Sequence, residues 1–373
     1  MKIFDTAREA LVELDVHQVA RIYTCGITPY DAAHMGHAAV YVTFDLLQRN
    51  LARHNVVSTC VRNVTDVDDD ILRKARTIGA NYLDLAAREM AKFDRDMAGL
   101  GLARPHAEPR ATSAIPEILT MVGDLMDGGF AYQVDGWVYF EVAKAPHFGK
   151  VSHLPRDMMM ELAAERGGNP GDLRKRDPLD FVLWQPSLPD EPSWESRFGP
   201  GRPGWHIECS ALAMRELGPV VDIHGGGSDL IFPHHECEAA QTEAITGGEF
   251  VKHWMHVGMV CLDGVKMSKS LGNLVFVGDL LKDSTGEEIR LAILSHHYRS
   301  TWDWSDAVLA SAKERIARWR SSGPGRGAFD EVAAALDNDL DTPTAIAAIE
   351  RAVAEGQGVR DTATLLGIDL EVA

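Results

Sequence analysis

The chain has 373 residues, of which 45% are hydrophobic and 25% are charged, and its formal net charge is −18. This composition supplies apolar side chains for two or three packed units with a substantial core, and it excludes an intrinsically disordered chain. The sequence contains no apolar run of the roughly 20 residues that a membrane helix needs and no signal-peptide pattern at its start, so we expect a cytoplasmic protein without a membrane partner.

The first part of the chain alternates between strand and helix patterns. Residues 19–25 form an apolar, β-branched run that predicts a buried strand, residues 31–53 carry apolar side chains near helical spacing, and residues 56–64 predict a second strand. A strand–helix–strand unit predicts a parallel sheet with both faces covered. A further helix is expected over residues 90–106, ending near Pro105.

An insertion is predicted to interrupt this pattern. Residues 109–200 contain a predicted helix (115–126), a short predicted strand (137–142) and a stretch rich in Pro, Gly and Trp (169–200). The α/β pattern then returns with a strand over residues 220–224.

The last part of the chain is predicted to be helical. Helices are expected over residues 305–319 and 329–353, separated by a Ser/Gly/Pro breaker at 321–325. We therefore predict an α/β fold, a Rossmann-type parallel sheet split by an insertion and followed by a small helical domain. Its parts are the first half of the catalytic domain (1–108), the insertion (109–200), the second half of the catalytic domain (201–304) and the C-terminal helical domain (305–373).

Two histidines stand where the first predicted strand leads into the first predicted helix. They belong to an HxGH motif, His34-Met35-Gly36-His37. A helix start offers free N–H groups and the positive end of its dipole, which favour a phosphate, and Gly36 lets a nucleotide approach the backbone. The two imidazoles can stabilise negative charge in a transition state. A pair of structural histidines is the alternative, which this motif alone does not exclude.

A KMSKS motif at residues 266–270 is the second segment with phosphate chemistry. Lys266 and Lys269 carry point charges on flexible stems, which can follow a leaving pyrophosphate; a solvated surface loop is the alternative. HxGH near the start followed by KMSKS resembles the signature of class I aminoacyl-tRNA synthetases, which activate amino acids on a Rossmann-type sheet. The resemblance implies that His34, His37, Lys266 and Lys269 are catalytic, and that ATP is a substrate accompanied by Mg²⁺.

Cysteine and histidine residues form a second candidate site. The cysteines are few and odd in number, so a disulfide framework is not expected, and metal binding or plain burial is open for each. Cys25 ends the first predicted strand, Cys209 lies in a WHIEC segment, and Glu238 follows His234 by four residues, so one helix face can carry both. Two thiolates and an imidazole suit Zn²⁺, and three firm ligands leave a position for a substrate thiolate that serine would fill poorly.

The CGxT, WHIEC and FPHHE segments resemble the cysteinyl-tRNA synthetase group, in which these positions hold zinc. The resemblance implies L-cysteine as substrate and one zinc ion per chain, bound by Cys25, Cys209 and His234, with Glu238 as a weaker fourth ligand. The other cysteines match no ligand position, and Cys60 and Cys261 are expected in strands or the core. The three without a ligand position are Cys60, Cys237 and Cys261.

Further segments of the same group contact the substrate or the adenylate. After a predicted strand, the GGGSD segment at 225–229 lets the backbone approach a nucleotide, and Asp229 can accept from ribose hydroxyls. Trp205 can close over the amino acid or pack in the core, and the acidic residues after Thr65 can form a ligand site or a solvated helix start. The resemblance assigns cysteine or adenylate binding to Cys25, Gly26, Ile27, Thr28, Val40, Asn63, Val64, Thr65, Trp205, Gly227, Ser228, Asp229 and Val260.

Two groups of enzymes share this core: the tRNA-charging enzymes and the mycothiol-pathway ligases, which join cysteine to glucosaminyl-inositol. The CGITPYD segment at 25–31, the alanines after His37, the ERGGNP segment at 165–170 and the place where the chain stops resemble the ligases. Residues 305–373 hold seven Lys and Arg against twelve Asp and Glu, the opposite of what a tRNA-binding tail requires. Glu238 and the DIHGGG segment are closer to the tRNA enzymes, and Val40 replaces a Thr that is common in the ligases.

We therefore expect a monomeric, ATP-dependent ligase that forms cysteinyl-adenylate and transfers cysteine to the amine of glucosaminyl-inositol. A tRNA-charging enzyme is the first alternative, although tRNA is a disfavoured partner. A non-catalytic zinc- or cysteine-binding relative of the synthetases is the second. A dinucleotide-dependent oxidoreductase is disfavoured because no GxGxxG segment follows the first predicted strand.

Overall fold

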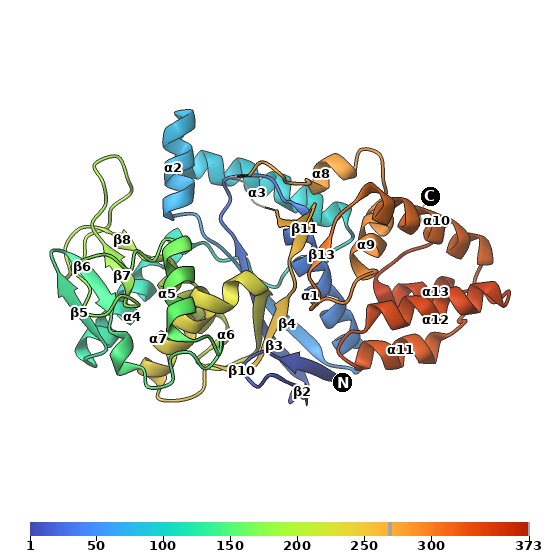
Figure 1. The fold of residues 1–373 in the computed structure, drawn as a ribbon, viewed down its shortest axis with the longest axis horizontal. Coiled ribbons are helices and arrows are strands. Elements are labelled where there is room, and N and C mark those ends of the chain that lie inside the picture. Colours follow the sequence, from blue (N-terminus) through green and yellow to red (C-terminus); the bar gives the residue numbers. More distant parts are fainter. Residues whose placement is uncertain (268–270, 372–373) are drawn as a thin grey trace.

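A parallel sheet forms the centre of the molecule in a computed structural model that describes residues 1–267 and 271–371 (Figure 1). Its strand order is β10-β9-β3-β4. The strands are β3 (Val19–Ile27), β4 (Val57–Val64), β9 (Val221–Gly227) and β10 (Val251–Val257). The chain order reverses between β3 and β9, and ligands bind at the carboxyl ends of strands at such a switch point. The predicted fold class is confirmed.

The first strand–helix–strand unit is confirmed, but its helix begins later than predicted. Helix α1 spans Met35–Arg53 rather than 31–53. His34 caps it: the His34 Nδ1 accepts the Gly36 N–H at 3.1 Å, and the extended backbone of His34 prevents an earlier start. The HxGH motif therefore stands at the first turn of the helix.

The helix predicted over 90–106 is displaced toward the N-terminus. Helix α3 spans Tyr82–Gly99, because Asn81 caps its start by accepting the Leu83 N–H at 2.9 Å, and Gly101, with φ +70°, takes the chain out of the helix. The acidic run before it starts a separate helix, α2 (Asp69–Ile78), whose N-cap is Asp68.

The insertion forms a small antiparallel sheet with the order β5-β6-β7-β8, at the left-hand end of Figure 1. The predicted helix over 115–126 is confirmed. The predicted strand ends two residues early, because the Val142 N–H donates to the Asp180 carboxylate at 2.8 Å instead of continuing the ladder. The elements are α4 (Ile115–Asp127), β5 (Ala131–Val134), β6 (Trp137–Phe140), α5 (Arg156–Glu165), β7 (Phe181–Gln185) and β8 (Arg202–Pro203).

Beyond the insertion, two helices pack against the sheet and small strands lead toward the KMSKS motif. The predicted strand over 220–224 is confirmed and continues through the three glycines. The elements are α6 (Trp205–Leu217), a π-helical turn (Ile231–His235), α7 (Glu236–Thr246), β11 (Val260–Leu262), β12 (Val265–Lys266), α8 (Val277–Leu280), α9 (Gly286–Leu294) and β13 (Trp302–Asp303). An N-terminal hairpin pairs β1 (Lys2–Asp5) with β2 (Ala10–Glu13).

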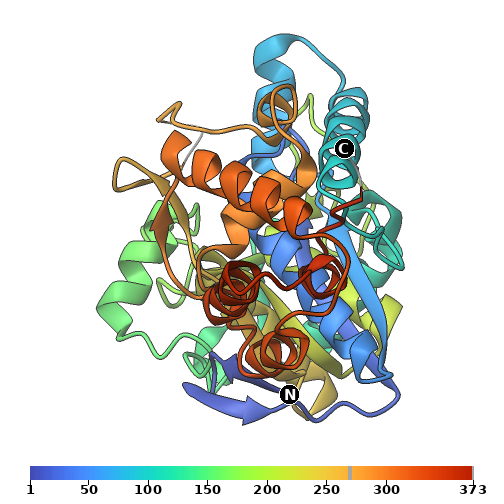
Figure 2. The same ribbon diagram turned by 90° about the vertical axis from the view of Figure 1, so that its right-hand side faces the viewer.

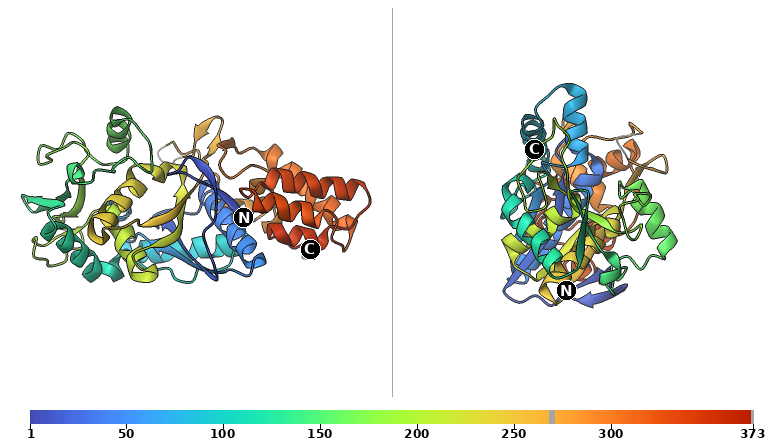
Figure 3. Two further views of the ribbon diagram at one scale, coloured as in Figure 1. Left: turned by 90° about the horizontal axis from the view of Figure 1, so that it is seen from below. Right: turned by 90° about the vertical axis from the view of Figure 1, so that its left-hand side faces the viewer.

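The C-terminal helices occupy the end of the molecule opposite the insertion, as Figures 1 and 3 show, and Figure 2 views them from that end. The single helix predicted over 329–353 is wrong. It is two helices, because Asp339 and Leu340 adopt positive φ of 62° and 50° and Asp341 caps a new start. The elements are α10 (Asp306–Ser322), α11 (Phe329–Asp337), α12 (Thr342–Ala354) and α13 (Arg360–Ala363).

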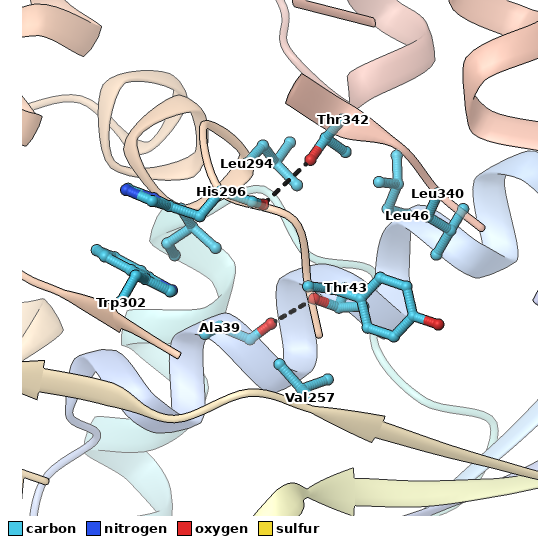
Figure 4. A pocket seen from close by; sticks show the side chains of 11 residues that line it. Ala39, Thr43, Leu46, Val257, Leu294, His296, Trp302, Leu340 and Thr342 are labelled. Atoms are coloured by element: carbon cyan, nitrogen blue, oxygen red, sulfur yellow. Dashed lines mark hydrogen bonds between the residues drawn. The ribbon is translucent and has the colours of Figure 1, made fainter. Parts of the chain in front are cut away.

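The C-terminal helices are joined to the part of the chain that carries the central sheet by shared packing. Figure 4 shows the junction around a small cavity between α1, the end of α9 and the start of α12. The Thr342 hydroxyl donates to the His296 carbonyl at 3.2 Å, and the His296 ring stacks on Trp302 with centroids 4.0 Å apart. Buried side chains from α1, α9, α10 and α12 belong to one apolar cluster, so this end and the sheet share a core.

A buried ion pair fixes α1 to α9. Arg290 is fully buried, pairs with the Asp45 carboxylate and donates from Nε to the Leu366 carbonyl at 2.7 Å. Burial alone would raise the pKa of Asp45, but Arg290 and Arg49 hold this pKa below its usual value. Because the pKa is lowered on folding, the pair stabilises the protein above a pH of about 4 and is lost as the pH falls below it.

We expect the Arg290→Met variant to lose about 3 kcal/mol of unfolding free energy, because the Asp45 carboxylate stays buried without its main partner. Urea denaturation at neutral pH measures the loss. Arg49→Met is the matched control: Arg49 bonds the same carboxylate at 2.7 Å but is partly exposed, and its loss should stay below about 1 kcal/mol. Equal losses in both variants would contradict this account of the junction.

Among the described residues, no helix combines the length and the apolar character that crossing a bilayer requires.

Candidate active site

Four metal-binding side chains meet at the carboxyl end of the central sheet. Cys25 stands near the end of β3, Cys209 in α6, His234 in the π-helical turn and Glu238 in α7. One donor atom from each lies within 4.8 Å of those of the others, and all four side chains are buried. The structure thus brings together the three predicted zinc ligands and the predicted weaker ligand.

The individual contacts leave the donor atoms facing one another. His234 Nε2 lies 3.3 Å from Cys209 Sγ and 3.1 Å from Glu238 Oε1, and Cys25 Sγ lies 3.6 Å from the same carboxylate oxygen. His234 and Glu238 are four residues apart in consecutive helical segments, which places both on one face.

The electrostatics of this cluster fit a bound cation. Burial lowers the pKa of His234 well below its usual value, so the imidazole is neutral and its lone pair is available. Burial, with the neighbouring Cys209 and Glu238, raises the pKa of Cys25 well above its usual value, which a metal ion would reverse by stabilising the thiolate. Two sulfurs, an imidazole nitrogen and a carboxylate oxygen are ligands that zinc takes in proteins.

Further histidines surround the donors, and sequence reasoning did not single them out. His206 Nδ1 lies 2.9 Å from His234 Nδ1, so it can orient that ring. On the other side, His224 Nε2 lies 2.9 Å from Glu238 Oε2, and His235 Nε2 lies 3.2 Å from Cys25 Sγ. His224 and His235 can form an alternative donor group with Cys25 and Glu238. The available signal was that His206 and His235 are part of the WHIEC and FPHHE segments and that His224 directly precedes the GGGSD segment.

Trp205 lies over the cluster. Its ring stacks on that of His234, with centroids 4.1 Å apart and an interplanar angle of 17°, and the side chain is only partly buried. The tryptophan thus packs against a predicted ligand and faces a cavity. Closure of Trp205 over the amino acid stays a prediction.

The backbone that follows Cys25, which is predicted to bind cysteine or the adenylate, is held by residues at and just after the end of β4. The Gly26 N–H donates to Asn63 Oδ1 at 2.7 Å, and Asn63 Nδ2 donates to Thr65 Oγ1 at 3.0 Å. A Cβ on Gly26 would lie 1.6 Å from the Asn63 carbonyl oxygen, so only glycine fits there. Ile27 pairs with Val64 across the two strands.

Two further residues predicted to bind cysteine or the adenylate, Thr28 and Val40, lie beside this backbone. The Thr28 hydroxyl donates to the Asp68 carboxylate at 2.9 Å, which joins the end of β3 to the start of α2. Val40 is half-buried in α1, where it packs against the core cluster. The segment that carries Cys25 is therefore fixed by both neighbouring elements.

The HxGH histidines lie together at the N-terminus of α1. The ring centroids of His34 and His37 are 4.0 Å apart, and His37 Nδ1 accepts the His34 N–H at 3.4 Å. Both side chains are half-buried and stand at a helix start that follows the carboxyl end of β3. This position suits charge stabilisation on phosphate groups.

The glycine-rich loop and the first lysine of KMSKS are also neighbours. Lys266 Nζ lies 2.8 Å from the Asp229 carboxylate, although 37 residues separate them in sequence. Gly227 ends β9, Ser228 begins the next turn, and Val260 begins β11 with its side chain buried. Lys269 lies outside the described residues.

The remaining cysteines are buried but do not belong to these donor groups. Cys60 lies in β4 and Cys261 in β11, as predicted, and Cys237 lies in α7. None of the three belongs to a potential metal-binding group among residues 1–267 and 271–371.

The sequence and the fold both match known synthetases. Residues 11–314 match the family described as tRNA synthetases class I (C) catalytic domain. The fold is similar to that of Mycobacterium tuberculosis methionyl-tRNA synthetase in complex with methionyl-adenylate, with a TM-score of 0.67 and 17% identity over 91% of this chain and 82% of that one. Fold and site together define a catalytic domain of the class I synthetase type.

More similar relatives define the family more narrowly. A protein of Streptomyces griseus subsp. griseus is 51% identical over 94% of this chain and 88% of its own length, and one of Nocardiopsis dassonvillei is 47% identical over 99% and 96%. Both are named L-cysteine:1D-myo-inositol 2-amino-2-deoxy-alpha-D-glucopyranoside ligase. The chain belongs to the family of these ligases, which confirms the relationship predicted from its motifs.

Proposed function

We propose that this chain is an ATP-dependent ligase that activates L-cysteine and joins it to the amine of glucosaminyl-inositol. The observation that carries the proposal is the buried group of Cys25, Cys209, His234 and Glu238 at the end of the central sheet. The names of relatives about half identical to this chain support the acceptor.

In the first proposed step, a carboxylate oxygen of cysteine attacks the α-phosphorus of ATP. The bond from that phosphorus to the bridging oxygen breaks, which gives cysteinyl-adenylate and pyrophosphate. His34 and His37, at the start of α1, stabilise the negative charge on the phosphates, and Lys266 reaches them from beside Asp229. Lys269 is assigned the same role from the motif alone.

In the second proposed step, the neutral amine of the acceptor attacks the adenylate carbonyl. An amide bond forms, the bond to AMP breaks, and the nitrogen releases a proton. Trp205 and the backbone of Gly26 to Thr28 hold the cysteine part, while Asn63 supports that backbone. No covalent bond to the protein is required.

Two metal ions are part of the proposal. Zn²⁺, one per chain, would be held by Cys25, Cys209 and His234, with Glu238 as a further ligand, and would supply a soft Lewis acid that favours sulfur over oxygen. Mg²⁺ would accompany ATP. We further propose a monomer with the four-part division predicted from the sequence, which gel filtration and limited proteolysis would test.

Transfer of cysteine to tRNA is the second candidate function, and the match to a tRNA synthetase catalytic domain favours it. Purified protein is incubated with ATP, Mg²⁺, labelled cysteine and either glucosaminyl-inositol or tRNA, and the product is identified by mass. We expect the amide with the aminosugar and no labelled tRNA. Cysteinylated tRNA without the amide would refute the proposed acceptor.

A further inference from the structure

A large cavity opens beside the cysteine site. Its volume is about 640 Å³, and it lies between the start of α2, the turn after α5, strand β7 and the start of α6. Volumes of this order accommodate a small-molecule ligand. The turn carries the ERGGNP segment, which the adenylation steps above leave without a role.

The inner end of this cavity reaches the reaction centre. Thr28 and Trp205 line it, and both belong to the proposed cysteine site. His206, which contacts the predicted zinc ligand His234, lines it as well. A molecule in the cavity is therefore adjacent to the activated cysteine.

The turn after α5 is anchored to the nucleotide loop. The Arg166 guanidinium donates to the backbone carbonyls of Asp229 and Phe232, and Lys175 donates to the Gly168 carbonyl. The Arg166 contacts hold one wall of the cavity against the loop that carries Asp229, and the Lys175 contact braces the wall itself. The wall is thus fixed to the loop that is predicted to contact the nucleotide.

The basic side chains that line the cavity already have partners within the chain. Arg174 pairs with Asp172 at 2.8 Å and lies over the Trp137 ring, 4.0 Å from its centroid. Arg73 pairs with Asp70. Together with the anchored Arg166 and Lys175, the basic side chains of the lining already have acceptors, so the cavity is not a polyanion site.

Asp68 brings a carboxylate to the inner end. It accepts the Thr28 hydroxyl at 2.9 Å and the Ile71 N–H at 2.9 Å, so its position is fixed by two elements. Carboxylates hold an ammonium group, and mixed polar groups beside an aromatic face suit a sugar or polyol. The lining offers a carboxylate at its inner end and polar side chains beside aromatic rings, which are the features that an amine-bearing polyol requires.

We propose that this cavity binds the acceptor, a polyol whose one ionisable group is an amine, with the amine at Asp68 and the hydroxyl-rich part between Arg174 and the turn at 165–169. The proposal rests on the function proposed above and names the part of the site that function needs for its second substrate. Asp68 and Arg174 are assigned to acceptor binding.

Steady-state amide formation at varied glucosaminyl-inositol tests this assignment in the full-length protein. Asp68→Asn retains a helix cap while removing the charge, and Arg174→Ala removes the outer contact. Each is expected to raise the acceptor KM at least about tenfold. In Arg174→Ala, which leaves the contact of Asp68 with Thr28 intact, cysteine-dependent ATP–pyrophosphate exchange needs no acceptor and should change far less than the acceptor KM.

Arg156→Ala is the matched control, since Arg156, at the start of α5, pairs with Asp177 at 2.7 Å and does not line the cavity. Its acceptor KM should equal that of the parent protein. An unchanged acceptor KM in both cavity variants, or a parallel fall in exchange and amide formation in Arg174→Ala, would overturn the assignment. If the parent protein showed no cysteine-dependent exchange or formed no amide, the proposed function itself would fail.

Discussion

The Cys209→Ser variant is expected to lose cysteine-dependent ATP–pyrophosphate exchange by at least about 100-fold. Cys209 Sγ lies 3.3 Å from His234 Nε2 inside the buried donor group, and serine replaces a soft sulfur with an oxygen that zinc binds poorly. The same variant should contain less than one zinc per chain after dialysis, measured by atomic emission. Zinc content is a readout that does not depend on activity.

Cys237→Ala is the matched control for this prediction. Cys237 is as fully buried as Cys209 and lies in α7, but it belongs to neither donor group. We expect its zinc content and exchange rate to stay close to those of the parent protein, with only a modest loss of thermal stability. A Cys209→Ser protein that kept its zinc and its exchange rate would contradict the assigned ligand set.

The His37→Ala variant is expected to lower the exchange rate about 100-fold, because it removes one positioned group from the site where phosphate charge develops. His37 is half-buried in the first turn of α1, with its ring 4.0 Å from that of His34. The loss should fall on the maximal exchange rate more than on the KM for cysteine, because the substrate thiol is held elsewhere. Exchange at varied cysteine and ATP separates these effects.

His54→Ala provides a control at the other end of the same helix. His54 follows α1 and lies 2.6 Å from the Asp337 carboxylate, at the opposite end of the helix from the HxGH motif. We expect full exchange activity from this variant. If both histidine variants lost activity equally, the effect would reflect the stability of the helix and not phosphate chemistry.

Local patterns predicted the elements that carry the site. The apolar run before Gly26 forms β3, and the HxGH motif stands at a helix start. Both could be predicted because they depend on residues that are close together in the sequence. The break between α11 and α12 was missed, although Asp341 and Pro343 form a recognisable helix start. An almost continuous apolar spacing on both sides outweighed that signal.

The candidate site also has a part that local sequence patterns could predict and a part that they could not. Cys25, Cys209, His234 and Glu238 could be named from the sequence because each stands in a motif shared with a known family. The contact of His235 with Cys25 spans 210 residues, so no local pattern contains it. The proposed acceptor cavity is assembled from six separate stretches of the chain, and only the folded chain brings them together.

The central claim is that a sulfur-selective metal site positions the amino acid for adenylation. Pyrophosphate exchange with cysteine and with serine, on protein of known zinc content, tests it most directly. The account predicts one zinc per chain and a kcat/KM for serine at least about 1000-fold below that for cysteine. Zinc-free protein with full activity, or serine used within tenfold of cysteine, would contradict it.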